Sequence, residues 1–121
     1  MSMDAAQAKM LRLIGLGVRG RGAVVGVERV REAATRGTLV LAIVAPDASR
    51  HSLDKVVPLL TAKRVTMIEG PTAAVLGRAV GRETTAAVGV TDANLARGIR
   101  DALESAALRW PEGNDGSSDG T

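Results

Sequence analysis

The sequence contains no cysteine, and this absence excludes disulfide bonds, thiolate metal sites and cysteine nucleophiles together. His51 is the single histidine, so a zinc site with several histidine ligands or an acid–base pair of histidines is not expected. Phenylalanine and tyrosine are absent as well, and Trp110 is the one aromatic residue. Modules that recognise single-stranded RNA by stacking bases on aromatic side chains are therefore not expected.

Long hydrophobic runs are also missing. The longest uninterrupted apolar run covers the seven residues 39–45, whereas a membrane-spanning helix needs about 20. Residues 1–9 lack the cationic start and apolar stretch of a secretory signal. We therefore expect no membrane partner and a cytoplasmic location.

The composition that remains is that of a globular domain. The chain has 121 residues, of which 45% are hydrophobic and 24% are charged, and this balance predicts one folded domain over residues 1–110. Residues 111–121 offer nothing to bury and carry three carboxylates. We expect them to form a disordered acidic tail.

Positive charge is concentrated near the N-terminal end. Of the 16 basic residues, 13 are arginine, and six of these lie between positions 12 and 36 against two glutamates. A basic body suits a polyanionic partner, and arginine makes bidentate contacts with phosphates and guanine edges. A GC-rich genome would produce the same arginine bias without selection for binding.

Helical and strand-like segments alternate along the chain. Apolar residues at helical spacing predict helices over residues 4–15, 27–36, 49–63, 72–79 and 92–108. In the first helix Ala5, Ala8, Leu11 (or the stem of Arg12) and Ile14 recur at helical spacing. Short or continuous apolar runs predict strands over residues 23–25, 38–45, 65–68 and 86–90. This alternation predicts an α/β sandwich with helices on both faces of a small sheet.

Glycine, proline and polar residues define the expected boundaries. Gly17, Gly20 and Gly22 are expected to break the first helix, and Gly37 to close the second. Pro58 lies inside the third helical stripe and is expected to kink or divide it. At the starts of the last two helices, Thr72 and Asp92 are placed to act as N-caps.

One glycine pattern matches the sequence motif of dinucleotide-binding proteins in residue type and spacing. Gly15, Gly17 and Gly20 have the G-x-G-x-x-G spacing, and Asp47 follows the next strand-like run. The mechanism requires a strand before the glycines and a helix that begins at them, whereas here the preceding segment is predicted to be helical. Asp47 also lies 27 residues beyond Gly20, further than the expected spacing of about 20.

Catalytic patterns are equally weak. Ser49, His51 and Ser52 are neighbours in sequence, but adjacent residues on a helix point apart, so a solvated first turn explains them. Glu28 and Glu32 share a helix face at i, i+4, where nearby arginines make a mixed-charge exposed surface the simpler interpretation. The sequence therefore predicts no catalytic residue, no cofactor and no metal.

A binding face remains as the third possibility. Gly26 precedes a helix whose first turns carry Glu28, Arg29 and Glu32. Free N–H groups and the helix dipole favour phosphate there, arginine binds a guanine edge, and a carboxylate accepts hydrogen bonds from guanine N–H groups. A merely solvent-exposed helix is the alternative.

Four sequence segments together resemble a known family. They are GLGVRGRGAVVGVERVREAATRG at 15–37, LVLAIVAPDAS at 39–49, LGRAVGRE at 76–83 and AVGVTD at 87–92. Their order and spacing resemble the YlxQ-like bacterial branch of the ribosomal proteins that bind kink-turn RNA, the archaeal L-seven-Ae and eukaryotic L-thirty-e relatives. The resemblance covers residues 6–99. It implies a three-layer α-β-α sandwich with a mixed four-stranded sheet.

The resemblance also implies an RNA-binding site. The family uses the N-terminus of its second helix and the loop before its last strand. In this sequence the helix motif falls on Gly26, Glu28, Arg29 and Glu32, where only the glycine matches, and the Gly-Lys that precedes it is inverted as Arg21-Gly22. Glu32 stands where the family has lysine. The loop keeps the family's shape and one positive charge, and its implied contact residues are Val80, Gly81, Arg82 and Thr84.

These observations predict a non-catalytic RNA-binding protein that is associated with ribosomes or translation. Its expected partner is a structured RNA, of which a kink-turn is one candidate, and not DNA. Carboxylates at positions 28 and 32 would repel phosphates, at a cost of about 1 kcal/mol per pair at 4 Å in water, which Arg29 and Arg31 would offset. The alternative function is a protein–protein adaptor that keeps the scaffold but has lost RNA binding.

Overall fold

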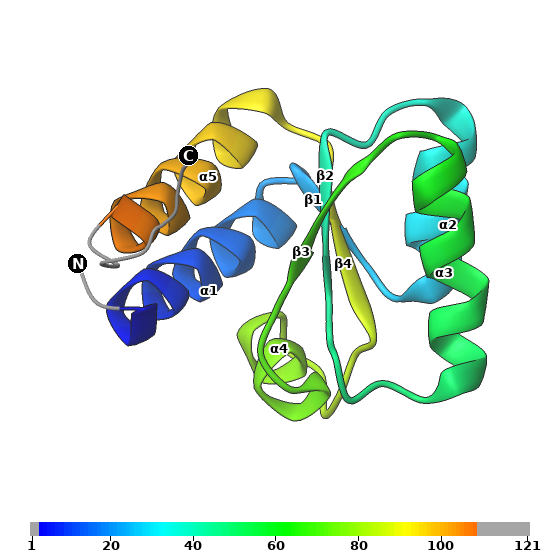
Figure 1. Ribbon diagram of the computed structural model, residues 1–121, viewed down its shortest axis with the longest axis horizontal. Helices are drawn as coiled ribbons and strands as arrows, with labels where there is room; N and C mark the ends of the chain where they lie inside the picture. Colours follow the sequence, from blue (N-terminus) through cyan, green and yellow to red (C-terminus); the bar gives the residue numbers. More distant parts are fainter. Residues whose placement is uncertain (1–2, 109–121) are drawn as a thin grey trace.

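The computed structural model describes residues 3–108 and shows helices on both sides of one sheet (Figure 1). Residues 109–121, which include the predicted tail, lie outside the described residues. The elements in chain order are α1 (Met3–Arg19), β1 (Ala23–Val25), α2 (Val27–Arg36), β2 (Leu41–Val44), α3 (Arg50–Ala62), β3 (Thr66–Glu69), α4 (Ala73–Ala79), β4 (Ala87–Val90) and α5 (Ala93–Leu108).

The sheet has four strands in the order β1-β4-β2-β3. β4 lies in the centre and pairs antiparallel with both β1 and β2, whereas β2 pairs parallel with the edge strand β3. The mixed four-stranded sheet that the family resemblance implied is therefore confirmed.

Each face of the sheet packs against helices through its own hydrophobic core. α1, α4 and α5 lie on one side of the sheet, and α2 and α3 lie on the other (Figure 1). On β2, Leu41 and Ile43 belong to the first core, and Ala42 and Val44 belong to the second. Both central strands are buried throughout, because each has helices on both faces. The three-layer α-β-α sandwich is confirmed.

Several predicted helix ends are present. Gly37 closes α2 in the left-handed conformation with φ 76°, which suits a residue without Cβ. Ser49 caps α3, and Thr72 and Asp92 accept hydrogen bonds from the N–H groups of Val75 and Leu95 at 3.3 and 2.8 Å. These side chains satisfy N–H groups that the first turn of a helix leaves unpaired.

The first helix is longer than predicted. The prediction that Gly17 breaks it is wrong, because α1 continues to Arg19, and the chain turns only at Gly20 and Gly22. A Cβ on Gly17 would lie 2.2 Å from Leu95 Cδ2. Gly17 therefore serves close packing between α1 and α5, and this tertiary contact outweighs the low helix propensity of glycine.

The buried face of α1 is not formed by the residues whose spacing predicted the helix, except Ile14. Ala6, Met10 and Ile14 are fully buried, whereas Ala5 and Ala8 are exposed. The buried positions follow a spacing of four, which is as compatible with a helix as the predicted set. Packing against α5 and the sheet selects between the two faces.

Pro58 does not divide the third helix, contrary to one of the predicted outcomes. α3 runs without interruption from Arg50 to Ala62 with Pro58 inside it, and Pro58 itself is exposed. Among the strands, β3 begins and ends one residue later than predicted, and β2 covers only Leu41–Val44 of the predicted 38–45. A proline within a helix still removes one backbone hydrogen bond and crowds the preceding turn.

We expect Pro58→Ala to stabilise the protein. The substitution restores an N–H donor inside α3, so the free energy of unfolding should rise by about 1 kcal/mol after the entropy of the unfolded chain is taken into account. Urea unfolding measures the change, with Asp54→Ala at another exposed position of α3 as the control. A lower stability of Pro58→Ala would show that the ring packs usefully where it lies.

Candidate nucleic-acid interface

Helix α2 begins at a glycine in a conformation that other residues rarely adopt. Gly26 has φ 97° and ψ 159° and provides no side-chain cap. Its N–H donates to the carbonyl of Ala87 at 2.9 Å. A Cβ at this position would meet nothing within 4 Å, so glycine is required here for backbone conformation and not for space.

Three backbone N–H groups at this helix start are free. The first bond inside the helix runs from Val30 N–H to the Gly26 carbonyl at 3.0 Å. Within residues 3–108, no group accepts a hydrogen bond from the N–H of Val27, Glu28 or Arg29. Unpaired donors together with the positive end of the helix dipole make this point attractive to an anion.

The loop before β4 is held by its backbone. Gly81 adopts φ 79° with no atom within 4 Å of its missing Cβ, and Arg82 N–H donates to the Gly77 carbonyl at 2.8 Å. A Cβ on Gly77 would lie 2.6 to 2.8 Å from backbone atoms of Thr84. The loop therefore lies directly on α4, while the side chains of Arg82 and Thr84 are exposed.

Strand pairing brings the helix start and the loop to the same end of the sheet. In the β1–β4 register Val25 faces Val88, so the chain after β1 lies beside the chain before β4. Thr85 is buried there and its hydroxyl donates to the Ala87 carbonyl at 3.2 Å. We call the following set the α2–loop surface: Gly26, Glu28, Arg29, Glu32, Val80, Gly81, Arg82, Glu83 and Thr84.

Charges on the α2–loop surface are only partly compensated. Lys55 of α3 lies 3.6 Å from the Glu28 carboxylate in an exposed ion pair. Arg31 also reaches α3, where it donates to the Lys55 carbonyl. Arg29 and Glu32 are exposed, and neither forms a hydrogen bond or an ion pair with a side chain in residues 3–108.

Arg21 and Gly22 lie away from this surface. The Gly22 carbonyl accepts from the N–H groups of Thr91 and Asp92 at 2.9 and 3.2 Å, which places it beside the far end of β4. Extended chain rises about 3.3 Å per residue, so Gly22 is about 13 Å from Gly26. The β1–β4 register thus places the start of α2 and the loop, which carry eight of the ten predicted contact residues, at one end of the sheet, and Arg21 and Gly22 at the other.

The alternative motifs have structural explanations. Gly15 and Gly17 lie inside α1, so no strand leads into the dinucleotide-like pattern. Asp47 accepts from the N–H of Ala73 at 2.7 Å and thereby caps α4. His51 is exposed in the first turn of α3, as expected for a solvated helix start.

Residues 3–108 contain no group of three or more His, Asp or Glu side chains arranged to hold a metal ion. No helix in the same range is long and apolar enough to cross a membrane.

Comparison with known families matches residues 8–100 to the Ribosomal protein L7Ae/L30e/S12e/Gadd45 family. The chain belongs to this family. The match includes every residue of the α2–loop surface, and it agrees with the fold that the sequence resemblance implied. No curated protein matches the chain.

Solved structures share the family fold. One is a protein with unknown function from Bacillus halodurans C, which is 30% identical, has a TM-score of 0.72, and is matched over 80% of this chain and 98% of its own. Another is the Giardia lamblia 15.5kD RNA binding protein, with 18% identity, a TM-score of 0.68, and coverage of 86% and 89%. At 18% identity the second likeness shows the fold alone.

Sequence reasoning missed two residues that shape this surface. Lys55 comes from another helix and pairs with Glu28, and no local pattern pointed to it. Gly77 supports the loop through its lack of a side chain. A glycine in a short predicted helix was the available signal, since glycine there normally has a packing reason.

We expect Gly77→Ala to displace the loop before β4. The added Cβ would overlap backbone atoms of Thr84, and backbone cannot yield as a flexible side chain does, so the free energy of unfolding should fall by about 1 to 3 kcal/mol. Urea unfolding and amide exchange at residues 80–84 measure the effect.

The matched control is Gly98→Ala in α5. Its Cβ would approach only the Leu13 side chain, at 3.4 Å, and the gain in helix propensity should leave stability equal or higher. Equal effects of both substitutions would contradict the tight contact between Gly77 and the loop.

Proposed function

We propose that this protein is a non-catalytic RNA-binding protein that binds a structured RNA through the α2–loop surface. The free N–H groups of Val27, Glu28 and Arg29 beside the exposed loop carry the proposal. They offer a fixed site for one or two phosphates, and Arg29 and Arg82 add positive charge. Family membership and the RNA-binding description of the Giardia structure support it.

The finer parts of the proposal concern the target and the cellular role. Kink-turn RNA is the candidate target, and ribosome association in the cytoplasm is the proposed setting, both from the resemblance to the YlxQ-like branch. A sharply bent RNA exposes base edges and phosphates that a regular A-form duplex hides from side chains. Such a target suits a surface that combines N–H donors with carboxylate acceptors.

A second function rests on the carboxylates themselves. Glu28 is partly neutralised by Lys55, but Glu32 is exposed and has no cationic partner among the described residues. Like charges disfavour phosphate at that position. The protein–protein adaptor that has lost RNA binding is therefore the alternative that the binding experiments must distinguish.

Charge substitutions on α2 test the proposal. Glu32→Lys changes the local charge by +2 and should raise the affinity for kink-turn RNA. Arg29→Glu should lower the affinity for whichever RNA the native protein binds. Each change should be about 1 to 2 kcal/mol, the scale of a charge-assisted contact at a partly wet interface. Both side chains are exposed, so both variants should fold normally.

Titration of a kink-turn RNA and a regular duplex at fixed salt measures these effects. Glu32→Lys should improve the kink-turn more than the duplex. If Glu32→Lys raises the affinity for both RNAs equally, the gain comes from nonspecific electrostatic attraction. If neither substitution changes binding to any RNA, the adaptor function is favoured instead.

Salt dependence tests the phosphate contacts separately. With three or four phosphates neutralised, log K should fall linearly with log salt with a slope of about −2 to −4. Titration of the native protein from low to moderate salt gives the slope. An affinity that does not change with salt would rule out phosphate contacts as the source of binding.

A further inference from the structure

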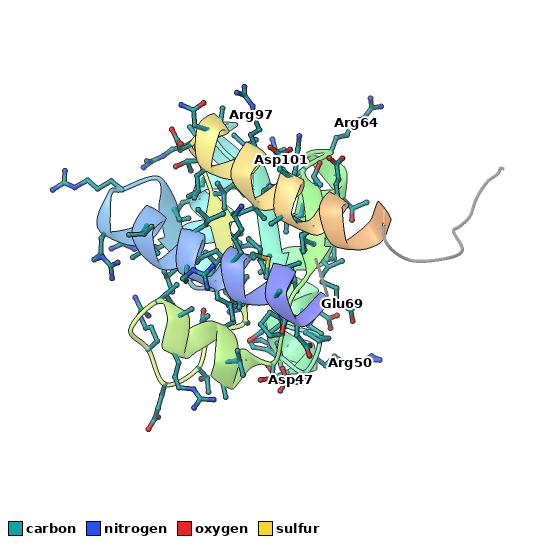
Figure 2. The ribbon with its side chains drawn as sticks, turned by 90° about the vertical axis from the view of Figure 1, so that its left-hand side faces the viewer. Asp47, Arg50, Arg64, Glu69, Arg97 and Asp101 are labelled. Atoms are coloured by element: carbon teal, nitrogen blue, oxygen red, sulfur yellow. The ribbon has the colours of Figure 1, made fainter. Side chains whose placement is uncertain are left out.

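On the opposite side of the sheet from α2, helices α1 and α4 border a hollow on the outside of the molecule (Figure 1). It has a volume of about 570 Å³ and is lined by Leu11, Leu16 and Val75 together with three arginines, Arg12, Arg19 and Arg78. Figure 2 shows α1 between α4 and α5 on this face of the sheet. We call the hollow the arginine groove.

The groove follows from helix geometry and one glycine. Positions 12, 16 and 19 share a face of α1 because they are spaced at i, i+4 and i+7. A Cβ on Gly15 would lie 2.8 Å from the Ala79 carbonyl oxygen, so α1 and α4 meet closely there. Leu16 is left 57% exposed between Arg12 and Arg19.

Charge in the groove is of one sign. None of its lining residues is acidic. Within residues 3–108, the guanidinium groups of Arg12, Arg19 and Arg78 form no ion pair and no hydrogen bond. An apolar floor with a rim of unpaired arginines fits a polypeptide that carries carboxylates, because arginine binds carboxylates bidentately and the floor accepts apolar groups.

The chain itself carries such a polypeptide. Residues 110–121 read WPEGNDGSSDGT, with three carboxylates at Glu112, Asp115 and Asp119 and no basic residue. Three carboxylates equal the three arginines in number and carry the opposite charge. The proposed function uses neither the groove nor this segment.

The segment starts within reach of the groove. Leu95 packs at Gly17 and Gly98 packs at Leu13, so α5 runs antiparallel to α1 and ends near the start of α1. From there the groove begins at Leu11, about 12 Å further along α1 at 1.5 Å per residue. The 13 residues after Leu108 span up to about 43 Å when extended, which is enough to reach Arg12, Arg19 and Arg78.

We propose that the acidic segment 111–121 binds in the arginine groove of its own chain. The short connection to α5 gives the segment a high effective concentration at the groove, so weak individual ion pairs suffice. The contacts are exposed and therefore weaken with salt. Segment docking rests on the groove and the segment alone and not on the proposed function.

Bound there, the segment would reach the edge of the α2–loop surface. A smaller adjoining hollow shares Gly15, Arg19, Arg78 and Ala79 with the groove and continues to Val80 and Gly81. Carboxylates at this place would repel phosphates that approach the loop. If the proposed function holds, the segment lowers RNA affinity and its neutralisation raises it.

The test compares two full-length proteins by amide NMR without RNA, the native chain and the variant Glu112→Gln, Asp115→Asn, Asp119→Asn. At low salt we expect shift differences at Leu11, Gly15, Leu16 and Val75, and we expect them to vanish at about 0.5 M salt. Identical spectra for these residues at low salt would overturn the proposal. Shifts that grow with protein concentration would show binding by a second copy and would also overturn it.

Arginine variants identify the docking face. The triple variant Arg12→Gln, Arg19→Gln, Arg78→Gln should release the acidic segment just as neutralisation of its carboxylates does. The NMR signals of Trp110, next to the segment in sequence, should therefore shift in this variant. The matched control Arg50→Gln, Arg64→Gln, Arg97→Gln removes the same charge from exposed residues outside the groove (Figure 2). The control variant should leave the Trp110 signals as in the native chain. Equal effects of the two triple variants would contradict specific binding of the segment in the arginine groove.

An RNA titration separates the groove from the proposed function. If kink-turn RNA binds at all, neutralisation of the acidic segment should raise its affinity several-fold at low salt and much less at high salt. A protein that binds no RNA but shows the groove shifts supports segment docking and rejects only the proposed function. RNA affinity that falls with the groove arginines, in a protein whose RNA-free spectra show no segment contact, would assign the groove to RNA and overturn docking.

Discussion

The antiparallel pairing of β1 with β4 is the constraint on which the candidate site depends. Its last bond, from Gly26 N–H to the Ala87 carbonyl at 2.9 Å, joins the strand pair directly to the first turn of α2. One register therefore fixes the position of the helix start and of the loop before β4 together. Gly26 makes this possible, because its φ of 97° turns the chain from strand to helix without a linker.

The rest of the architecture depends on how closely the helices pack against the sheet. On the α2 side of the sheet the central strands present Ala42, Ala87 and Gly89, and a Cβ on Gly89 would lie 2.6 Å from Leu39 Cδ2 and 3.4 Å from Val30 Cγ2. Small residues let α2 lie near β4, so the free N–H groups stay beside the loop. On the opposite side the larger Leu41 and Ile43 pack in one core with residues of α1 and α5.

Local signals were sufficient for most of the fold and insufficient for contacts between elements. Gly37, Thr72 and Asp92 act at helix ends that periodicity had already defined, so each was predictable from its neighbours. Gly17 was mistaken for a helix breaker because its reason is Leu95, 78 positions later in the chain. The site divides the same way: Gly26 and the loop followed from the family resemblance, whereas Lys55 beside Glu28 required the packing of α3 on α2.

Charge on the α2–loop surface restricts the kind of RNA that the proposed function requires. Backbone N–H groups can bind phosphate without a cationic side chain, and Lys55 already offsets the charge of Glu28. Glu32 lies one turn further along α2 with no such partner among residues 3–108. A regular backbone that continued along α2 would bring phosphates to this carboxylate, at a cost that grows as water is excluded. A bent RNA that turns base N–H donors toward α2 avoids that cost, since a carboxylate accepts from them. The acidic substitutions therefore favour recognition of shape and base edges over binding by charge.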